Sequence, residues 1–340
     1  MSRASERPEP VCEAGTLKGV GLSRHPFDRH RLLRSEYLVL LLSLVYFIAL
    51  APFTPGFVTP GNLANILSTL LPLFVAAVGQ TLVLIAGGID LSVTSIIAIT
   101  SVSGAAVMHV EGLAGSPLAV PAGILTMLLI GALIGLLNGA AVTGFRMPAF
   151  IVTLTTMMFF SGLAIWLTQS RNIGNLPAAF NAIGGKTWLA FLVVAGLAGA
   201  VHWMLTRSLL GRWLYAVGHN ARTSLISGVP VNGVIIAAYV ASGVLAAVAA
   251  VLYTGQTESG SPVLAQRLLL DIVGATVIGG SSLFGGKGKV LWTLFGVLFI
   301  KVIDNSLNLL GLSHFSIMMV KGAVILLAAM MDSARNRMLA

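Results

Sequence analysis

The sequence has little charge, a single cysteine and few aromatic residues. Only 9% of its 340 residues are Asp, Glu, Lys or Arg and 7% are aromatic, whereas 56% are hydrophobic. A soluble domain carries about 25% charged residues, so this composition excludes an ordinary soluble protein. The mean hydropathy of +0.94 indicates an integral membrane protein instead.

Signals for enzymatic chemistry and metal binding are also scarce. The single cysteine, Cys12, lies in a polar segment and has no second cysteine for a disulfide. The histidines are scattered, without the i, i+4 spacing of a metal site. No Ser-His-Asp or paired-carboxylate arrangement can be argued from the spacing. We therefore predict no cofactor and no metal, and a protein that is not an enzyme.

The nearest approach to a nucleotide-binding loop is Ser281–Gly288, SSLFGGKG. It has a Gly-Lys pair at Gly286 and Lys287, but it lacks the first glycine of a phosphate loop and the hydroxyl that binds Mg²⁺. We predict a tight cytoplasmic turn here, with any ATP hydrolysis carried out by a separate subunit.

Ten apolar segments fill most of the chain, and each approaches the ~20 residues that a helix needs to cross a bilayer. They lie near 35–53, 63–87, 91–110, 118–140, 149–169, 187–206, 232–253, 268–284, 289–310 and 315–331. The segment 268–284 is short and rich in glycine. The fold class predicted is therefore an all-α integral membrane protein with about ten transmembrane helices.

Positive charge falls on one side of these segments. With a cytoplasmic N-terminus, alternation places these basic residues inside: Arg146, Arg207, Arg212, Arg222, Lys287, Lys289, Arg335 and Arg337. The opposite connections hold Glu111, Arg171, Lys186, Glu258 and Arg267. Because Lys and Arg concentrate in cytoplasmic loops, both termini are predicted to be cytoplasmic. The net charge of +9 is then a topology signal, not a sign of nucleic-acid binding.

The chain divides into three parts. Residues 1–34 are polar, without an apolar period, and predict a disordered cytoplasmic tail. Residues 35–332 form the transmembrane domain and 333–340 a cytoplasmic C-terminal tail. A cleaved signal peptide is the alternative for the first apolar run, but the leading polar segment is too long for one, which favours an uncleaved span.

We predict a short helix within the longest cytoplasmic connection, residues 207–232. Gly228 and Pro230 follow the segment Ala221–Ser227, and glycine and proline in that order are ordinary helix stop signals. A short capped helix connected to a membrane span on each side is suited to docking a partner protein that moves the spans. The alternative is an interfacial turn without a partner. The external segments 170–187 and 254–267 either contact a periplasmic partner or are plain connectors.

The stretch Gly79–Ala106 holds a glycine pair and a carboxylate between two apolar runs. Such a sequence predicts a helix break whose backbone groups must be satisfied inside protein or water. Asp90 is the first intramembrane polar residue to consider. It either shapes a path or gate, or caps the helix that begins near Leu91.

Six motifs in consistent order over residues 55–332 resemble the permease subunit of bacterial ribose-type ABC importers. They are GGIDLSV at 87–93, LLNG at 136–139, PAFIVTL at 148–154, GRWLYAVGHN at 211–220 with SGV at 227–229, IGGSSLFGGKG at 278–288 and LNLLG at 307–311. The resemblance implies a type II importer fold in the bacterial inner membrane, with the region 218–228 as the coupling element.

The same resemblance implies function and partners. A permease of this kind moves a monosaccharide or related polyol and associates with a second permease subunit, a cytoplasmic ATPase and a periplasmic sugar-binding protein. Two alternatives stay open: an ion- or proton-coupled secondary transporter, motivated by Asp90, Asp271 and the pair Lys301 and Asp304, and a nucleoside or branched-chain amino-acid permease.

Two groups of site residues follow. The candidates for the translocation path or gate are Gln80, Gly87, Gly88, Asp90, Ser92, Asn138, Thr153 and Asn308. The candidates for the ATPase-coupling loop are Gly218, Asn220, Ala221, Arg222, Ser224, Ser227 and Gly228. Lys301 and Asp304 lie three residues apart on one helix and are expected to form a local ion pair, or else to pair across a subunit interface.

Overall fold

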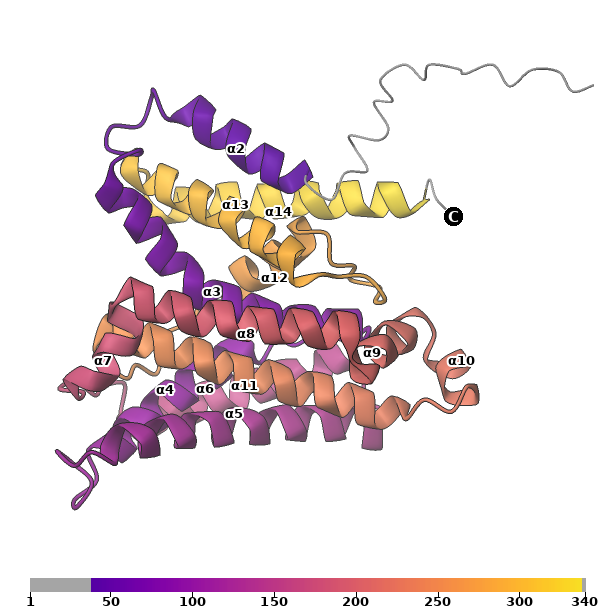
Figure 1. Ribbon diagram of the computed structural model, residues 1–340, viewed down its shortest axis with the longest axis horizontal. Coiled ribbons are helices and arrows are strands. Elements are labelled where there is room, and N and C mark those ends of the chain that lie inside the picture. Colours follow the sequence, from indigo (N-terminus) through magenta and orange to yellow (C-terminus); the bar gives the residue numbers. More distant parts are fainter. Residues whose placement is uncertain (1–37, 338–340) are drawn as a thin grey trace, which may run out of the picture. The chain divides into compact units, whose positions relative to one another are not determined.

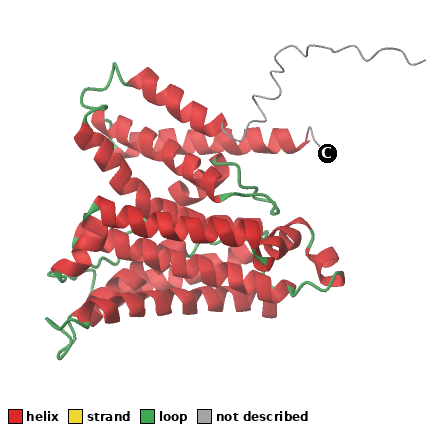
Figure 2. Ribbon diagram, in the orientation of Figure 1, coloured by secondary structure: helices red, strands yellow, loops and turns green. Residues whose placement is uncertain are grey.

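The computed structural model describes residues 38–337, which form thirteen α-helices (Figure 1). Their bounds are α2 Leu38–Leu50, α3 Pro60–Ile85, α4 Val93–Met108, α5 Ala119–Gly144, α6 Ala149–Thr168, α7 Ala178–Gly185, α8 Thr187–Arg207, α9 Leu209–His219, α10 Ala221–Ile226, α11 Val231–Thr257, α12 Leu269–Ile278, α13 Val290–Leu309 and α14 His314–Arg337. The described residues contain no strand, as Figure 2 shows. The tail expected at 1–34 lies outside the described residues, and α14 continues to Arg337, into the C-terminal segment expected at 333–340.

The prediction of an all-α membrane protein is confirmed, and each of the ten expected spans corresponds to a helix. Six helices are long and apolar enough to cross a membrane: α3, α5, α6, α8, α11 and α13. The other four contain apolar stretches of 10–17 residues: α2, α4, α12 and the first part of α14. The bundle therefore contains several helices that are shorter than a full membrane span. Where such a helix ends away from water, neighbouring protein must supply hydrogen-bond partners for its terminal backbone groups.

Two local predictions differ from the structure. The segment predicted as a span over 268–284 is helical only over α12, because Gly280, at φ +105°, adopts a left-handed backbone just after the helix ends. Ten residues at 1.5 Å each cover about 15 Å, roughly half of the hydrocarbon core. The connector at 170–187 contains the unpredicted helix α7, which packs against α11.

The helix α3 lies at the centre of the bundle. Every residue from Leu70 to Ile85 is buried, which is expected of a helix that is apolar on all sides. It packs against α11, α13, α12 and α8, helices from the middle and the C-terminal part of the sequence. In Figure 1 it runs between the group formed by α2, α12, α13 and α14 and the group that contains α5, α8 and α11.

A glycine seam brings α5 and α11 together, the most extensive helix contact in the chain. Gly131, Gly135 and Gly139 follow one another at four-residue spacing on α5 and face the backbone of α11. A Cβ atom on Gly135 would lie 2.8 Å from the Cα of Val240. Small residues at this spacing let two helix backbones approach closely inside a membrane.

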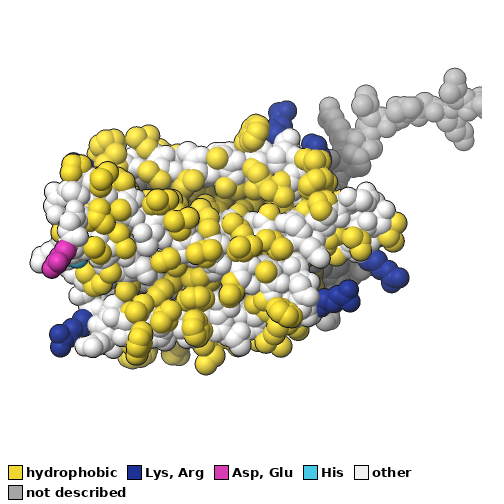
Figure 3. All heavy atoms as spheres, turned by 90° about the horizontal axis from the view of Figure 1, so that it is seen from below, with side chains coloured by type: hydrophobic (Ala, Val, Ile, Leu, Met, Phe, Trp, Pro, Cys, Tyr) yellow, Lys and Arg dark blue, Asp and Glu magenta, His cyan; other side chains and the backbone are white. Residues whose placement is uncertain are grey.

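The outer surface is mainly hydrophobic. Figure 3 shows hydrophobic side chains over the middle of the face that includes α5, with charged side chains at its margins. Leu125, Leu129 and Leu133 repeat every four residues along α5, and more than half of each is exposed. Lipid tails provide the apolar surroundings that such a face requires.

Replacing Gly135 by valine tests the seam. The side chain would overlap the α11 backbone, and overpacking of this kind costs about 1–3 kcal/mol. We expect Gly135→Val to lower the thermal unfolding midpoint of the detergent-purified permease by several degrees. Gly196→Val is the matched control, because a Cβ atom on Gly196 meets nothing within 4 Å. Equal midpoints for the two variants would contradict a close-packed seam.

Candidate functional site

The candidate site is the break between α3 and α4. Gly87 has φ +82°, a left-handed backbone that turns the chain after Ile85. Gly88 follows in a place without room for a side chain, since a Cβ atom there would lie 2.7 Å from the hydroxyl of Tyr239. Gly87 is therefore required by its backbone conformation, and Gly88 by the lack of space for a side chain.

The side chain of Asp90 is fully buried within this break. Its Oδ1 accepts hydrogen bonds from the backbone N–H of Ser92 at 2.9 Å and from the Ser92 hydroxyl at 2.6 Å. Its Oδ2 accepts a hydrogen bond from the hydroxyl of Ser242, on α11, at 2.9 Å. Three donors thus compensate for the burial of the carboxyl group.

Hydrogen bonds extend this arrangement to α5 and α6. The Asn138 amide donates to the Ser92 hydroxyl at 2.8 Å, and the Thr156 hydroxyl donates to the Asn138 Oδ1 at 2.8 Å. Each of these three side chains is buried. The start of α4 is therefore linked to three other helices: α5, α6 and, much later in the sequence, α11.

The carbonyl oxygen of Ile89 is also satisfied. The hydroxyl of Tyr239 donates to it at 3.2 Å and that of Thr153 lies 3.3 Å from it. A backbone carbonyl outside a helix has no local partner and must find one when it is buried. Side chains from α6 and α11 supply that partner here, so the break is held from several sides.

The structure brings together six of the eight predicted path or gate residues: Gly87, Gly88, Asp90, Ser92, Asn138 and Thr153. The remaining two make no hydrogen bond with this group. Gln80 is fully buried on α3, and its amide atoms have no hydrogen-bond partner within the described residues. Asn308 is exposed near the end of α13, where its amide donates to the backbone oxygen of Asp304 at 2.7 Å.

Sequence reasoning missed two residues of α11 that hold this break, Tyr239 and Ser242. They lie three residues apart and therefore on one face of the helix. The rule that a polar residue inside a span marks a site applies to both of them. Their signal was weak because serine and tyrosine are common in apolar helices for ordinary packing reasons.

The predicted coupling loop contains two consecutive helices, α9 and α10. Asn220 ends the first and caps the second, because its Oδ1 accepts a hydrogen bond from the Thr223 N–H at 2.9 Å. Gly228 has φ +81° and ends the short helix. Leu225 and Ile226 are the last two residues of α10, and they are 64% and 81% exposed.

The other predicted coupling residues occupy different surroundings. Ser224 is buried, Ser227 donates a hydrogen bond to the Thr223 backbone oxygen at 3.0 Å, and Ala221 and Arg222 are exposed. Gly218 differs from these residues, because it packs against the C-terminal end of α3. A Cβ atom on Gly218 would collide with the backbone oxygen of Ile85 and lie 2.6 Å from the Gly286 nitrogen.

The loop 279–289 completes this glycine junction, which we define as Gly87, Gly218, Gly285 and Gly286. The backbone N–H of Gly286 donates to the Ile85 oxygen at 2.9 Å. Gly285 and Gly286 both have positive φ and lie against Gly218, Gly87 and the His219 ring. The loop is a tight turn, as its sequence predicts.

Tyr215 ties the same loop to α9. Its hydroxyl donates to the Gly288 oxygen at 2.7 Å. Burial raises the pKa of this phenol above its usual value of 10.0, so the group stays protonated and remains a donor at physiological pH. The α9–α10 segment, the loop 279–289 and the end of α3 therefore form one contact region.

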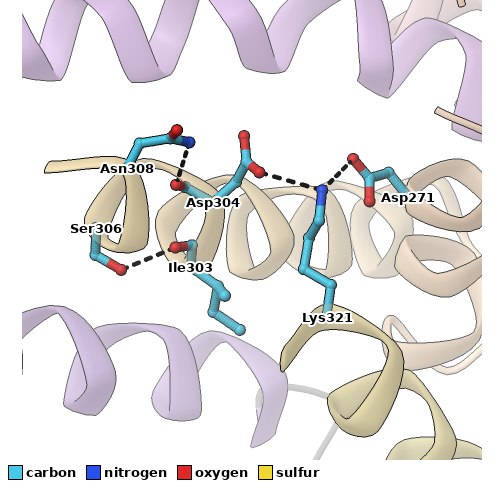
Figure 4. Close-up of polar contacts among 6 residues, drawn as sticks. All are labelled: Asp271, Ile303, Asp304, Ser306, Asn308 and Lys321. Carbon is cyan, nitrogen blue, oxygen red and sulfur yellow. Dashed lines mark hydrogen bonds and ion pairs between the residues drawn. The ribbon is translucent and has the colours of Figure 1, made fainter. Parts of the chain in front are cut away.

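A second polar group lies elsewhere, among α12, α13 and α14 (Figure 4). Lys321 contacts two carboxylates, with its Nζ 3.0 Å from Asp271 Oδ2 and 3.1 Å from Asp304 Oδ1. The expectation of a local pair between Lys301 and Asp304 is wrong, because Asp304 pairs with Lys321 of α14 instead. Asp271 is buried and paired with Lys321.

No metal-binding group of three or more His, Cys, Asp or Glu side chains occurs within residues 38–337. The polar clusters that do occur consist of hydroxyls, amides, carboxylates and ammonium groups. Their chemistry is that of hydrogen bonding and electrostatic interaction.

Comparisons with known proteins agree over nearly the whole chain. The sequence is 35% identical over 322 residues to the ribose import permease protein RbsC of Escherichia coli K12, covering 92% of this chain and 98% of that protein. It is 36% identical over 297 residues to RbsC of Bacillus subtilis, covering 85% and 90%. The L-arabinose transport system permease protein AraH of Escherichia coli K12 is 30% identical over 340 residues, covering 95% and 97%.

No solved structure matches the chain. A family match extends over residues 62–329, from the start of α3 into α14, and its description is branched-chain amino acid transport system, permease component. It includes the helix break and the glycine junction. The protein is therefore a transport component and not an enzyme. It belongs to the permease family that this description names.

Proposed function

We propose that this chain is the membrane-spanning subunit of an ATP-driven importer for a monosaccharide or a related polyol. The two ribose permeases resemble it over 92% and 85% of its length, and a third relative is an L-arabinose permease. Its partners are a cytoplasmic ATPase, a periplasmic sugar-binding protein and a second permease subunit. The chain supplies the path, and ATP is hydrolysed on another subunit.

The observation that carries the mechanism is the contact of Gly218 with the end of α3. Closure of the ATPase moves α10 through its exposed Leu225 and Ile226. Because Gly218 meets the backbone of Ile85 without an intervening side chain, that motion displaces the α3–α4 break directly. Two closely packed backbones cannot absorb such a shift by changing rotamers.

The break then acts as the gate. Asp90, Ser92 and Asn138 join the start of α4 to α5 and α11 by hydrogen bonds. A displacement of this segment therefore moves several helices together. In this proposal Asp90 holds the backbone of the gate and does not bind cargo, since its side chain is fully buried.

The orientation proposed places the glycine junction in the cytoplasm, with both termini on that side. Support comes from Arg207, Arg212 and Arg222, which flank or lie within the α9–α10 segment, and from Lys287 in the adjoining loop. Basic residues mark cytoplasmic loops. The opposite end is then periplasmic. There Ile173 and Gly260 exchange two backbone hydrogen bonds, of 2.8 and 2.9 Å, that join the two external segments.

Reconstitution in proteoliposomes tests the proposal. The permease is combined with the ATPase and the secreted binding protein encoded beside it, and uptake of labelled D-ribose, L-arabinose and leucine is followed. We expect sugar uptake that requires ATP and both partners. Uptake by the permease alone, driven by a proton or sodium gradient, would identify a secondary transporter. Uptake of leucine in place of sugars would assign an amino-acid permease.

Two substitutions at Asp90 separate hydrogen bonding from charge. Asn keeps one acceptor oxygen, whereas Leu leaves the Ser92 and Ser242 donors unpaired, at about 1–3 kcal/mol each. We expect Asp90→Leu to reduce sugar uptake by about tenfold or more and Asp90→Asn to retain a substantial part of it. Equal loss in both variants, in fully assembled complexes, would show that the charge is what matters.

Gly218→Ala tests the glycine junction. The added methyl group overlaps the backbone of Ile85, and relief of about 1–3 kcal/mol of overpacking requires the junction to separate. We expect uptake to fall by about tenfold while ATP hydrolysis continues. Gly233→Ala is the control at the same end of the molecule, since a Cβ atom there lies 4.0 Å from Pro230. Normal coupled uptake by Gly218→Ala would remove the junction from the mechanism.

A further inference from the structure

The charged group around Lys321 contains two hydrogen-bond donors that have no partner among residues 38–337. We define the charged cluster as Asp271, Lys301, Asp304, Lys321 and Tyr253. Lys321 bridges both carboxylates, as Figure 4 shows. That arrangement leaves Lys301 and the hydroxyl of Tyr253 as the unused donors of the cluster.

Lys301 is the first of these donors. It is only 8% exposed, and its ammonium makes no hydrogen bond or ion pair with any residue in 38–337. The charges that act on it are those of Asp304, Asp271 and Lys321. A buried ammonium group without a direct partner costs several kcal/mol, so a cation in this state inside a membrane protein indicates a function.

Tyr253 is the second donor. Its hydroxyl on α11 is buried and has no hydrogen-bond partner among the described residues. The carboxylates of Asp271 and Asp304 act on it electrostatically, as they do on Lys301. A buried hydroxyl without a partner costs about 1–3 kcal/mol. Two unsatisfied donors therefore converge on one region.

The backbone around the cluster is typical of a binding site in a transporter. Asp271 is in the first turn of α12, which has only ten residues and follows an irregular segment. Short, interrupted helices near the middle of the membrane commonly bind transported substrates. The side chain of Asp304 is 29% exposed. Lipid cannot solvate a carboxylate, so this exposed side faces protein or a water-filled path.

We propose that the charged cluster binds the hydroxyl groups of a neutral polyhydroxylated cargo on its way through the permease. Lys301 and Tyr253 donate to oxygen atoms of the cargo, and the accessible carboxylate of Asp304 accepts from its hydroxyl groups. Lys321 and Asp271 hold that carboxylate in place. This inference rests on the proposed function, because it names a contact site for the same sugar.

The charges favour a neutral cargo over an ionic one. Two carboxylates and two ammonium groups sum to zero within the cluster. An anionic or cationic cargo would leave one uncompensated charge in low dielectric, at a cost of several kcal/mol. A sugar or polyol adds no charge and supplies both donors and acceptors. The cluster therefore fits a hydroxyl-rich molecule without an acid or amine group.

Saturation-transfer NMR on the purified permease tests this site without any need for transport. D-ribose, L-arabinose and ribitol are the probes, with D-gluconate as the anionic comparison. We expect signals from the three neutral probes with the native chain. Lys301→Met should reduce them by about tenfold and Tyr253→Phe by a smaller factor, because each removes a donor. Tyr46→Phe is the matched control, since the Tyr46 hydroxyl bonds to Ser306 at 3.0 Å outside the cluster.

Several results would overturn the inference. Signals that are absent from the native chain, or unchanged in both Lys301→Met and Tyr253→Phe, would show that the cluster does not bind cargo. A stronger signal from D-gluconate that depends on Lys301 would replace the neutral ligand by an acid. If Lys301→Met fails to fold, Tyr253→Phe decides, since it removes one oxygen atom only. The uptake assay judges the proposed function separately.

Discussion

The structure depends on satisfying polar groups where α3 stops inside the protein. A helix break in a membrane leaves backbone N–H and C=O groups without local partners, and lipid offers none. Here the Tyr239 hydroxyl donates to the carbonyl oxygen of Ile89, and the Asp90 carboxylate accepts from the N–H of Ser92. Ser242 and Asn138 in turn bond to the side chains of Asp90 and Ser92. These bonds join the segment to α5 and α11, so in the proposed mechanism a displacement of the break moves both helices.

Close backbone packing has a similar double effect on the cytoplasmic side of the proposed orientation. Gly218, Gly285 and Gly286 let the coupling loop, the loop 279–289 and the end of α3 meet directly. In the proposed mechanism, side chains between these segments would yield by changing rotamer and would weaken the transmission of force. Glycine has no side chain that can yield in this way. The cost is backbone entropy, which is acceptable where three segments hold one another in place.

The two polar groups of the protein differ in how completely they are satisfied. Both side-chain oxygens of Asp90 have partners, which suits a fixed structural element. The charged cluster retains unused donors at Lys301 and Tyr253. Incomplete satisfaction is costly in a protein interior and is typical of a place where a ligand completes the hydrogen bonds. In our proposals the first group is a fixed part of the gate and the second is a binding site for cargo.

The sequence by itself determined the solvent, the class of fold and the place of the helix break. Hydropathy acts over about twenty consecutive residues, and the motif at 87–93 is local, so both can be read along the chain. Only the tertiary structure decided which side chains meet. The i, i+3 spacing pointed Lys301 to Asp304, but Lys321 from α14 occupies that carboxylate. Tyr239 and Ser242 reach the break across about 150 residues. Such pairings depend on how helices pack, and local patterns carry no information about that.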